Sequence, residues 1–235
     1  MIKTVLAVAS SVAALTAAAH AEPKFYAGIN FGQNSFSDGE LRGSNAAGAP
    51  RNIDIEFDSG QFIAGSLGFI AGENEYGRVR FDVEAAFRDG DVDELVLNDV
   101  ERRVRDGSEL SATTVMVNAY YDTPQFAERF RGFAGAGFGV GSIDHEVRYL
   151  VERPQEAGGN LAIAIPSTET TLAYQFVIGA EAEITPNLSF IVDGRFVEFG
   201  DTQVERSILT TGALDSVLDS DNGATTVSFG LRASF

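Results

Sequence analysis

The chain has 235 residues, a formal net charge of −17 and no cysteine. Such an acidic chain lacks the basic surface that nucleic-acid phosphates require, which argues against nucleic acid as a partner. Without cysteine, disulfides and thiolate metal sites are excluded, so a closed hydrogen-bonded barrel is one candidate source of stability.

The first 21 residues have the features of a secretory signal peptide. Lys3 gives a positive start, residues 5–19 are apolar and rich in alanine, and Ala19-His20-Ala21 is a small-x-small cleavage site. The apolar run is too short for a membrane helix, and no charged stop-transfer segment follows it. We expect Sec-type export, cleavage after Ala21 and one mature domain of residues 22–235.

The mature chain alternates apolar and polar residues with period two in eight segments, which is the pattern of β-strands. The clearest segment is RVRFDVEAAFR (78–88), which places Val79, Phe81 and Val83 on one face and charges on the other. As a helix it would scatter charge around the whole cylinder. In chain order the predicted strands are 24–34, 57–70, 78–88, 109–121, 130–142, 172–184, 188–196 and 227–235.

The segments between these strands are long and short in strict alternation. The long ones are 35–56, 89–108, 143–168 and 200–224, and the short ones are 71–75, 122–129 and 185–187. In an up-and-down sheet this alternation puts all long segments at one end, as in transmembrane barrels. The sequence therefore predicts an all-β fold, an eight-stranded antiparallel up-and-down transmembrane β-barrel with four long external loops and three short periplasmic turns.

A soluble β-sandwich is the alternative, because its strands also alternate apolar and polar residues. It explains neither the ordered loop lengths nor the apolar C-terminal Phe235. It also gives no reason for four glycines on a polar face, Gly135, Gly137, Gly139 and Gly141. In a small barrel, whose lumen is filled by side chains, such glycines would make room for bulky neighbours.

Charged residues occur in the middle of the predicted strands, on the face that a barrel would turn inward. Ionised groups that leave water must be paired or they cost several kcal/mol each. Acids and bases nearly balance on this face, although the whole chain is acidic. We therefore predict an interior salt-bridge network of Asp82, Glu84, Arg131, Glu181, Asp193, Arg195 and Arg232.

The chain resembles the small outer-membrane barrels of the OmpA/OmpX type, including opacity-like surface proteins of the porin family. The segments that carry the resemblance are KFYAGINFG (24–32), RVRFDVEAAFR (78–88), ITPNLSFIVDGRF (184–196) and VSFGLRASF (227–235). It covers the mature chain and implies the outer membrane of a Gram-negative cell. It also implies a C-terminal assembly signal of Phe229, Leu231, Ala233 and Phe235, recognised by the barrel-insertion machinery.

Fold alone does not settle function in this family. We expect a structural or surface-interaction role, with outer-membrane lipids and lipopolysaccharide as partners, no cofactor, and the external loops carrying any extracellular ligand. The first alternative is a narrow pore for small solutes, although eight strands leave a lumen barely wide enough for their own side chains. A lipid-modifying enzyme ranks behind both.

Residues with catalytic or metal-binding potential are few. The mature chain has a single histidine, His145 in SIDH (142–145), and we interpret it as a surface residue near the rim, not as part of a Ser–His hydrolase site. The segment DGDVDE (89–94) has the first ligand positions of a calcium loop. Glu94 stands where that loop needs glycine, so we predict a solvated acidic loop and no metal site.

Overall fold

The computed structural model describes residues 25–45, 48–152, 159–209, 211 and 213–235. The predicted signal peptide lies outside these residues. The described part is all-β, and it contains no helix long and apolar enough to cross a membrane. The strands are β1 (Phe25–Phe36), β2 (Gly39–Asn45), β3 (Pro50–Phe57), β4 (Gly60–Asn74), β5 (Gly77–Leu97), β6 (Val100–Val104), β7 (Glu109–Asp122), β8 (Phe130–Val151), β9 (Leu161–Thr185), β10 (Leu188–Phe199), β11 (Thr202–Ile208), β12 (Ala213–Asp221) and β13 (Gly223–Ser234).

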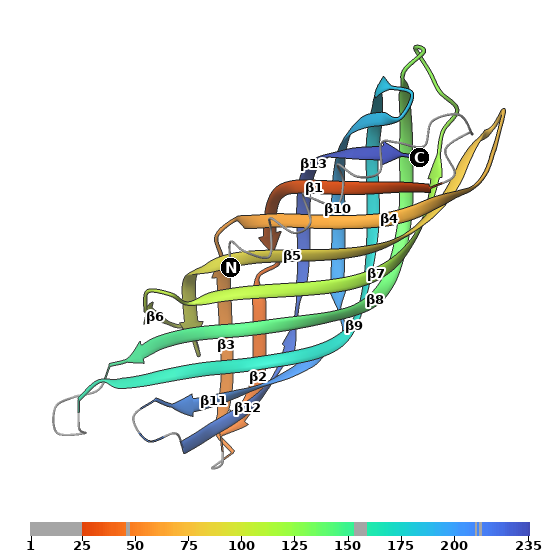
Figure 1. Ribbon diagram of the computed structural model, residues 1–235. Helices are drawn as coiled ribbons and strands as arrows, with labels where there is room; N and C mark the ends of the chain where they lie inside the picture. The colour runs from red at the N-terminus through yellow and green to blue at the C-terminus, as the bar shows by residue number, and fades with distance from the viewer. Residues whose placement is uncertain (1–24, 46–47, 153–158, 210, 212) are drawn as a thin grey trace.

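These strands form one antiparallel sheet that closes on itself (Figure 1). From β1 the pairings run through β4, β5, β7, β8, β9, β10 and β13, and β13 pairs again with β1. We call this series the lower barrel, and each predicted strand overlaps one of its members. Closure gives each strand a hydrogen-bonded neighbour on both sides, so this part of the sheet has no free edge.

The segments predicted as long external loops are largely β-strand, so that prediction was wrong. They hold β2, β3, β6, β11 and β12 together with one end of β5, β8 and β9. These strands also pair in a closed series, β2–β3–β5–β6–β8–β9–β11–β12–β2. We call this series the extension; β6, β11 and β12 lie at the end of the molecule away from the C-terminus (Figure 1).

β8 shows why the sequence pattern concealed the extension. In its first half the even-numbered residues, such as Phe138 and Val140, are apolar and exposed, and glycines alternate with them. In its second half the even-numbered residues from Ser142 to Arg148 are polar, while Ile143, Val147 and Tyr149 at odd positions are buried. The alternation of faces is unbroken, but the apolar face changes from the outside to the inside. A strand prediction that follows one apolar face therefore ends where this change occurs.

Apolar cores lie inside the extension and in the part of the lower barrel next to it. The core of the extension consists of Leu41, Ile53, Ile55, Val92, Leu95, Leu97, Val147, Tyr149, Ile163, Ile165, Val204 and Leu218. The core next to it consists of Phe36, Leu110, Ala112, Met116, Ile143, Ala173, Val197, Phe199 and Ala224. The outer positions of the extension are mostly polar, with Val100, Leu214 and Val217 as exposed exceptions. The extension thus has the arrangement of a barrel in water, with an apolar inside and a largely polar outside.

The outside of the lower barrel is a continuous apolar belt. Its exposed side chains are Phe31, Leu67, Phe69, Phe81, Val83, Val115, Val117, Phe138, Val140, Leu172, Phe176, Ile178, Phe190, Val192, Phe196, Val227, Phe229 and Leu231. Toward the extension the outward positions become polar, at Asp89 in β5, Ser142 in β8 and Thr170 in β9. The apolar outward positions run from Val79 to Phe87 along β5 and from Leu172 to Ile184 along β9. At about 3.3 Å per residue and a tilt of about 40°, these runs span about 20 Å and about 30 Å, which brackets the ~25 Å apolar band of membrane barrels.

The glycines on the inner face of β8 allow close approach to the neighbouring strand β7. A Cβ atom on Gly135 would lie 2.2 Å from the Tyr120 ring, so the expectation that these glycines make room for bulky side chains is confirmed there. At Gly139 the neighbour is backbone: a Cβ would lie 2.0 Å from the Val115 carbonyl oxygen and 2.7 Å from Met116 Cα. The spacing of β7 and β8 therefore depends on Gly139 having no side chain.

Gly139→Ala should destabilise the barrel by about 1–3 kcal/mol, the usual cost of overpacking, because backbone atoms must move to admit the methyl group. The matched control is Gly194→Ala in β10, where a Cβ would meet nothing within 4 Å. Urea unfolding, followed by the gel shift between the folded and the heat-denatured forms, measures both. Equal midpoints for the two variants would contradict the assignment.

Candidate functional site

The lower barrel encloses a column of buried charged side chains, which we call the lumen network. Its residues alternate along the strands with those of the apolar belt and therefore point inward. The network comprises the carboxylates of Asp82, Glu84, Asp122, Glu181 and Asp193 and the guanidinium groups of Arg78, Arg80, Arg88, Arg195 and Arg232. Five acids balance five bases, although the whole chain carries a net charge of −17.

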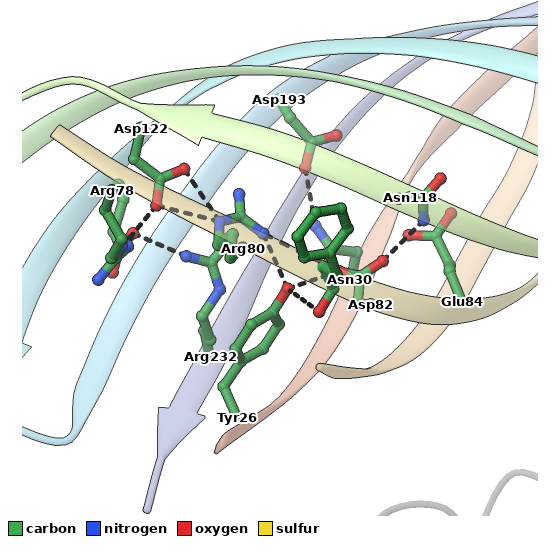
Figure 2. A network of polar contacts seen from close by, with 12 residues as sticks. Tyr26, Asn30, Arg78, Arg80, Asp82, Glu84, Asn118, Asp122, Asp193 and Arg232 are labelled. Carbon is green, nitrogen blue, oxygen red and sulfur yellow. Dashed lines mark hydrogen bonds and ion pairs between the residues drawn. The ribbon is translucent and has the colours of Figure 1, made fainter. Parts of the chain in front are cut away.

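Near the turns, acids and bases alternate across the lumen (Figure 2). Asp122, whose side chain is fully buried, accepts hydrogen bonds from Arg78 Nε at 2.6 Å and Arg80 Nε at 2.9 Å. Glu181 Oε2 accepts from Arg78 Nη2 at 2.8 Å and from Arg232 Nη1 at 2.7 Å. These contacts join β5, β7, β9 and β13, so the ion pairs connect strands that are not neighbours in the sheet.

Asp82 occupies the next level of the lumen. Its carboxylate accepts hydrogen bonds from the Tyr26 hydroxyl at 2.9 Å and from Asn118 Nδ2 at 2.8 Å, while Arg80 Nη1 lies 3.9 Å away. The Arg80 guanidinium is 3.9 Å from the centre of the Tyr120 ring. The Asp82 carboxylate is thus stabilised mainly by neutral hydrogen-bond donors, and the Arg80 guanidinium is stabilised by an aromatic ring in addition to its ionic partner.

Arg195 organises the level closest to the apolar cores. Its Nη1 contacts Glu84 Oε2 at 2.5 Å, and its Nε donates to Asp193 Oδ1 at 2.7 Å. Asp193 also accepts from Ser228 Oγ at 2.6 Å and from Asn30 Nδ2 at 3.0 Å. With these partners, most of the hydrogen-bonding capacity of the buried carboxylates is used, as burial of charge demands.

The lumen network leaves little space inside the lower barrel. The cavity among Asp82, Glu84, Arg195 and Arg232 has a volume of about 20 Å³, which is room for about one water molecule. Beyond it toward the extension lie the two apolar cores. Arg88 is the exception to the pairing: among the described residues it has no ion pair, its Nη1 donates to Thr114 Oγ1 at 3.4 Å, and its Nε and Nη2 have no hydrogen-bond partner. The lumen is therefore filled first by charged side chains, most of them paired, and then by apolar side chains.

The structure brings together all but one of the residues predicted for the interior network. Asp82, Glu84, Glu181, Asp193, Arg195 and Arg232 lie in it. Arg131 does not: it is the second residue of β8, at the turn end, and its Nη2 pairs with Glu73 Oε1 at 2.7 Å. Sequence reasoning missed Tyr26, Asn30, Asn118 and Asp122. The period-two pattern of β7 could have found Asp122, since it shares the inward face of Asn118 and Tyr120.

The residues predicted as an assembly signal lie on the outside of β13 and at its end. Phe229 and Leu231 are exposed in the apolar belt, and Ala233 and Phe235 are half-buried. The ring of Phe235 stacks on that of Phe25, with centroids 6.4 Å apart. The start of β1 and the residue after β13 thus lie side by side at the turn end of the lower barrel.

His145 is buried inside the extension, so its interpretation as a surface residue was wrong. It faces inward because β8 continues past residue 142, and it lies opposite Leu110 of β7 and Ser167 of β9. Its Nε2 has no hydrogen-bond partner, and the Ser167 hydroxyl donates to Glu169 at 2.9 Å. Within the described residues, no hydrogen bond joins His145 to a serine. Burial lowers the pKa of His145 to about 4, against weaker opposing effects of Glu169 and Asp144.

The acidic segment 89–94 is part of strand β5, so the prediction of an acidic loop was wrong there too. The carboxylate of Asp89 accepts a hydrogen bond from the backbone N–H of Gln61 at 2.6 Å. Among the residues that the structure describes, no group of three or more His, Asp or Glu side chains is arranged to hold a metal ion.

Comparison with known proteins identifies the architecture. The family model described as outer membrane protein beta-barrel domain matches residues 4–235. The outer membrane protein OprG from Pseudomonas aeruginosa is similar with a TM-score of 0.62 at 11% identity, covering 91% of this chain and 97% of that one. The outer membrane protease OmpT from Escherichia coli is similar with a TM-score of 0.56 at 10% identity, covering 94% and 99%. At these identities the two structures share the fold alone. No curated protein matches the chain.

Asp122→Asn should destabilise the barrel by about 3–5 kcal/mol, because it removes a buried charge that Arg78 and Arg80 share and leaves them under-compensated. Urea unfolding of the refolded chain measures the loss. The matched control is Glu40→Gln in the exposed pair with Arg42, which should change stability by less than about 1 kcal/mol. A loss no greater than that of the control would show that the lumen network contributes little.

Stability should also depend on pH through His145. Its pKa of about 4 in the folded chain lies below the value of about 6.5 in the unfolded chain, so the unfolded chain binds the proton first. The stability that neutral, buried His145 contributes to the folded chain is therefore fully present above pH 6.5. It is lost as pH falls from 6.5 toward 4, because the unfolded chain takes up the proton in this interval. The variant His145→Gln should lose less stability over this interval than the unmodified chain in urea unfolding at each pH. Parallel pH profiles for the two proteins would contradict the assignment.

Proposed function

Because this chain belongs to the outer membrane protein beta-barrel family, we propose that it is an integral outer-membrane protein with a structural or surface-interaction role and no enzymatic activity. The observation that carries the proposal is the filled lumen. Charged side chains, nearly all of them in ion pairs, fill the turn end of the lower barrel, and apolar cores fill the rest of it and the extension. The interior therefore fits a scaffold better than a passage for solutes. A filled lumen stiffens the barrel but offers no route for solutes.

The proposed membrane span is the ring of eight strands that forms the lower barrel. Three features support it: the apolar belt, the inward charges and the closed ladder, since backbone N–H and C=O groups in hydrocarbon need internal partners. The short turns after β4, β7 and β9 would then lie in the periplasm, together with the start of β1 and the end of β13. The extension would stand outside the cell, where the polar residues above the belt meet the lipopolysaccharide layer.

A folded extension suits a surface-interaction role. A surface held by paired strands and an apolar core presents side chains in fixed positions, so binding a partner would cost less ordering than with flexible loops. The outer faces of β2, β3, β6, β11 and β12 would carry any extracellular ligand. Outer-membrane lipids would contact the belt, and the insertion machinery would read Phe229, Leu231, Ala233 and Phe235 during assembly.

A narrow pore for small solutes is the alternative role. It requires a continuous path of water, and the roughly 20 Å³ cavity in the lumen network holds about one water molecule. A lipid-modifying enzyme ranks behind it, because His145 is buried and its Nε2 has no partner. OmpT is by its name a protease, which shows that this fold alone does not decide for or against catalysis.

The purified mature chain, inserted in a planar lipid bilayer, should give no steady open current of porin size. The lumen variant Asp193→Ala/Arg195→Ala should stay closed as well, because the apolar cores seal the interior independently of the charges. A general porin in the same bilayer is the positive control. A steady ohmic current from the unmodified chain would overturn the scaffold role in favour of the pore.

A further inference from the structure

A second cavity lies at the turn end of the lower barrel and has a volume of about 340 Å³. This volume falls in the range of small-molecule sites. Its charged lining consists of Glu73, Arg78, Arg129, Arg131, Glu181 and Glu183, three of each sign. Arg78 and Glu181 belong to the lumen network and form its inner wall, so the cavity is blind. It opens to the periplasm if the chain has the orientation given under the proposed function.

One ion pair spans this cavity. Arg131 of β8 reaches Glu73 of β4, with Nη2 and Oε1 2.7 Å apart, although β5 and β7 separate these strands in the sheet. Glu73 is 46% exposed and Arg131 16% exposed. The pair therefore fixes opposite walls of the mouth relative to each other and leaves the rest of the lining accessible.

Two further charged groups of the lining, Arg129 and Glu183, have almost no partners. They are neighbours, because the backbone N–H of Glu183 donates to the Arg129 carbonyl at 2.9 Å. Glu183 lies two residues along β9 from Glu181, on the same face of that strand, and Arg129 immediately precedes β8; both side chains line the cavity. Within the described residues no ion pair engages either group, and Glu183 accepts one hydrogen bond, from Gln125 Nε2 at 3.3 Å.

A free guanidinium beside a nearly free carboxylate is a complementary receptor for two opposite charges. A ligand that carried only one charge would leave the other group unused and would meet a lining with no net charge to attract it. Arg129 and Glu183 could also pair with each other, but an exposed ion pair contributes little free energy, so this pairing competes only weakly with binding of a ligand. Ile70, Ala71 and Pro186 add an apolar wall on which a short aliphatic group can pack.

We propose that this cavity binds a small zwitterion, such as an amino acid or the end of a short peptide. The carboxylate of the ligand pairs with Arg129, its ammonium group pairs with Glu183, and its aliphatic part lies against Ile70 and Pro186. The site is separate from the extension and from any extracellular ligand.

The test uses the full mature chain, refolded in detergent micelles, and four forms of one dipeptide. Alanyl-alanine carries both charges, its N-acetyl form only the negative one, its C-terminal amide only the positive one, and the doubly capped form neither. Calorimetric or NMR titration should give saturable one-to-one binding of alanyl-alanine. Each capped form should bind at least about tenfold more weakly, because a charge-assisted hydrogen bond is lost.

Variants of the two free groups test the assignment. Arg129→Gln and Glu183→Gln should each weaken binding of alanyl-alanine about tenfold or more, and the exchange Arg129→Glu/Glu183→Arg should restore part of it. A role limited to holding the strands together predicts no such restoration. The matched controls are Glu75→Gln in the exposed β4–β5 turn and Arg42→Gln in the extension, neither of which lines the cavity. The gel shift on heating confirms that each variant is folded.

The inference is overturned if no saturable binding occurs at millimolar dipeptide, or if the singly charged or doubly capped forms bind as tightly as alanyl-alanine. In the first case the cavity is a solvent-filled vestibule only. Failure of this inference is distinguishable from failure of the proposed function, because outer-membrane fractionation and bilayer current are measured without the dipeptide. If the protein is found in the outer membrane, gives no bilayer current and binds no zwitterion, this inference is wrong and the proposed function stands.

Discussion

The closed antiparallel ladder is the constraint on which the rest of this structure depends. In a hydrocarbon surrounding no water is available to satisfy backbone N–H and C=O groups, so a sheet can exist there only without edges. The ladder from β1 through β13 and back to β1 meets this demand. Closure with this few strands makes the lumen narrow, and a narrow lumen must be filled by the side chains that the strands turn inward.

The filling changes character along the axis, and the orientation that we propose explains the change: lipid surrounds the lower barrel and water surrounds the extension. Where lipid lies outside, apolar side chains are already used on the outer face, and the inner face carries polar and charged groups that must satisfy one another. Asp122 between Arg78 and Arg80, and Arg195 between Glu84 and Asp193, are the result. Where water lies outside, the same strands turn apolar side chains inward, and Ile143, Val147 and Tyr149 continue the row begun by glycines.

Several parts of the site were within reach of sequence reasoning. Period-two alternation identified the inward face of β5, β9, β10 and β13, and with it Asp82, Glu84, Glu181, Asp193, Arg195 and Arg232, because strand geometry alone fixes which residues share a face. Arg131 was misplaced because alternation gives the face but not the depth along the axis. The polar neighbours Tyr26, Asn30 and Asn118 were missed because pairing across the lumen depends on which distant strands face each other.

The sequence by itself determined which residues lie on the same side of each strand, that the strands run up and down, and that charge inside the barrel had to balance. These are local properties of the chain and its composition. Only the tertiary structure decided that β2, β3, β6, β11 and β12, together with one end each of β5, β8 and β9, form a second closed ring of strands, and that His145 is buried within it. The physical reason is that alternation does not say which face is inside: that depends on whether lipid or water surrounds the closed sheet at each height.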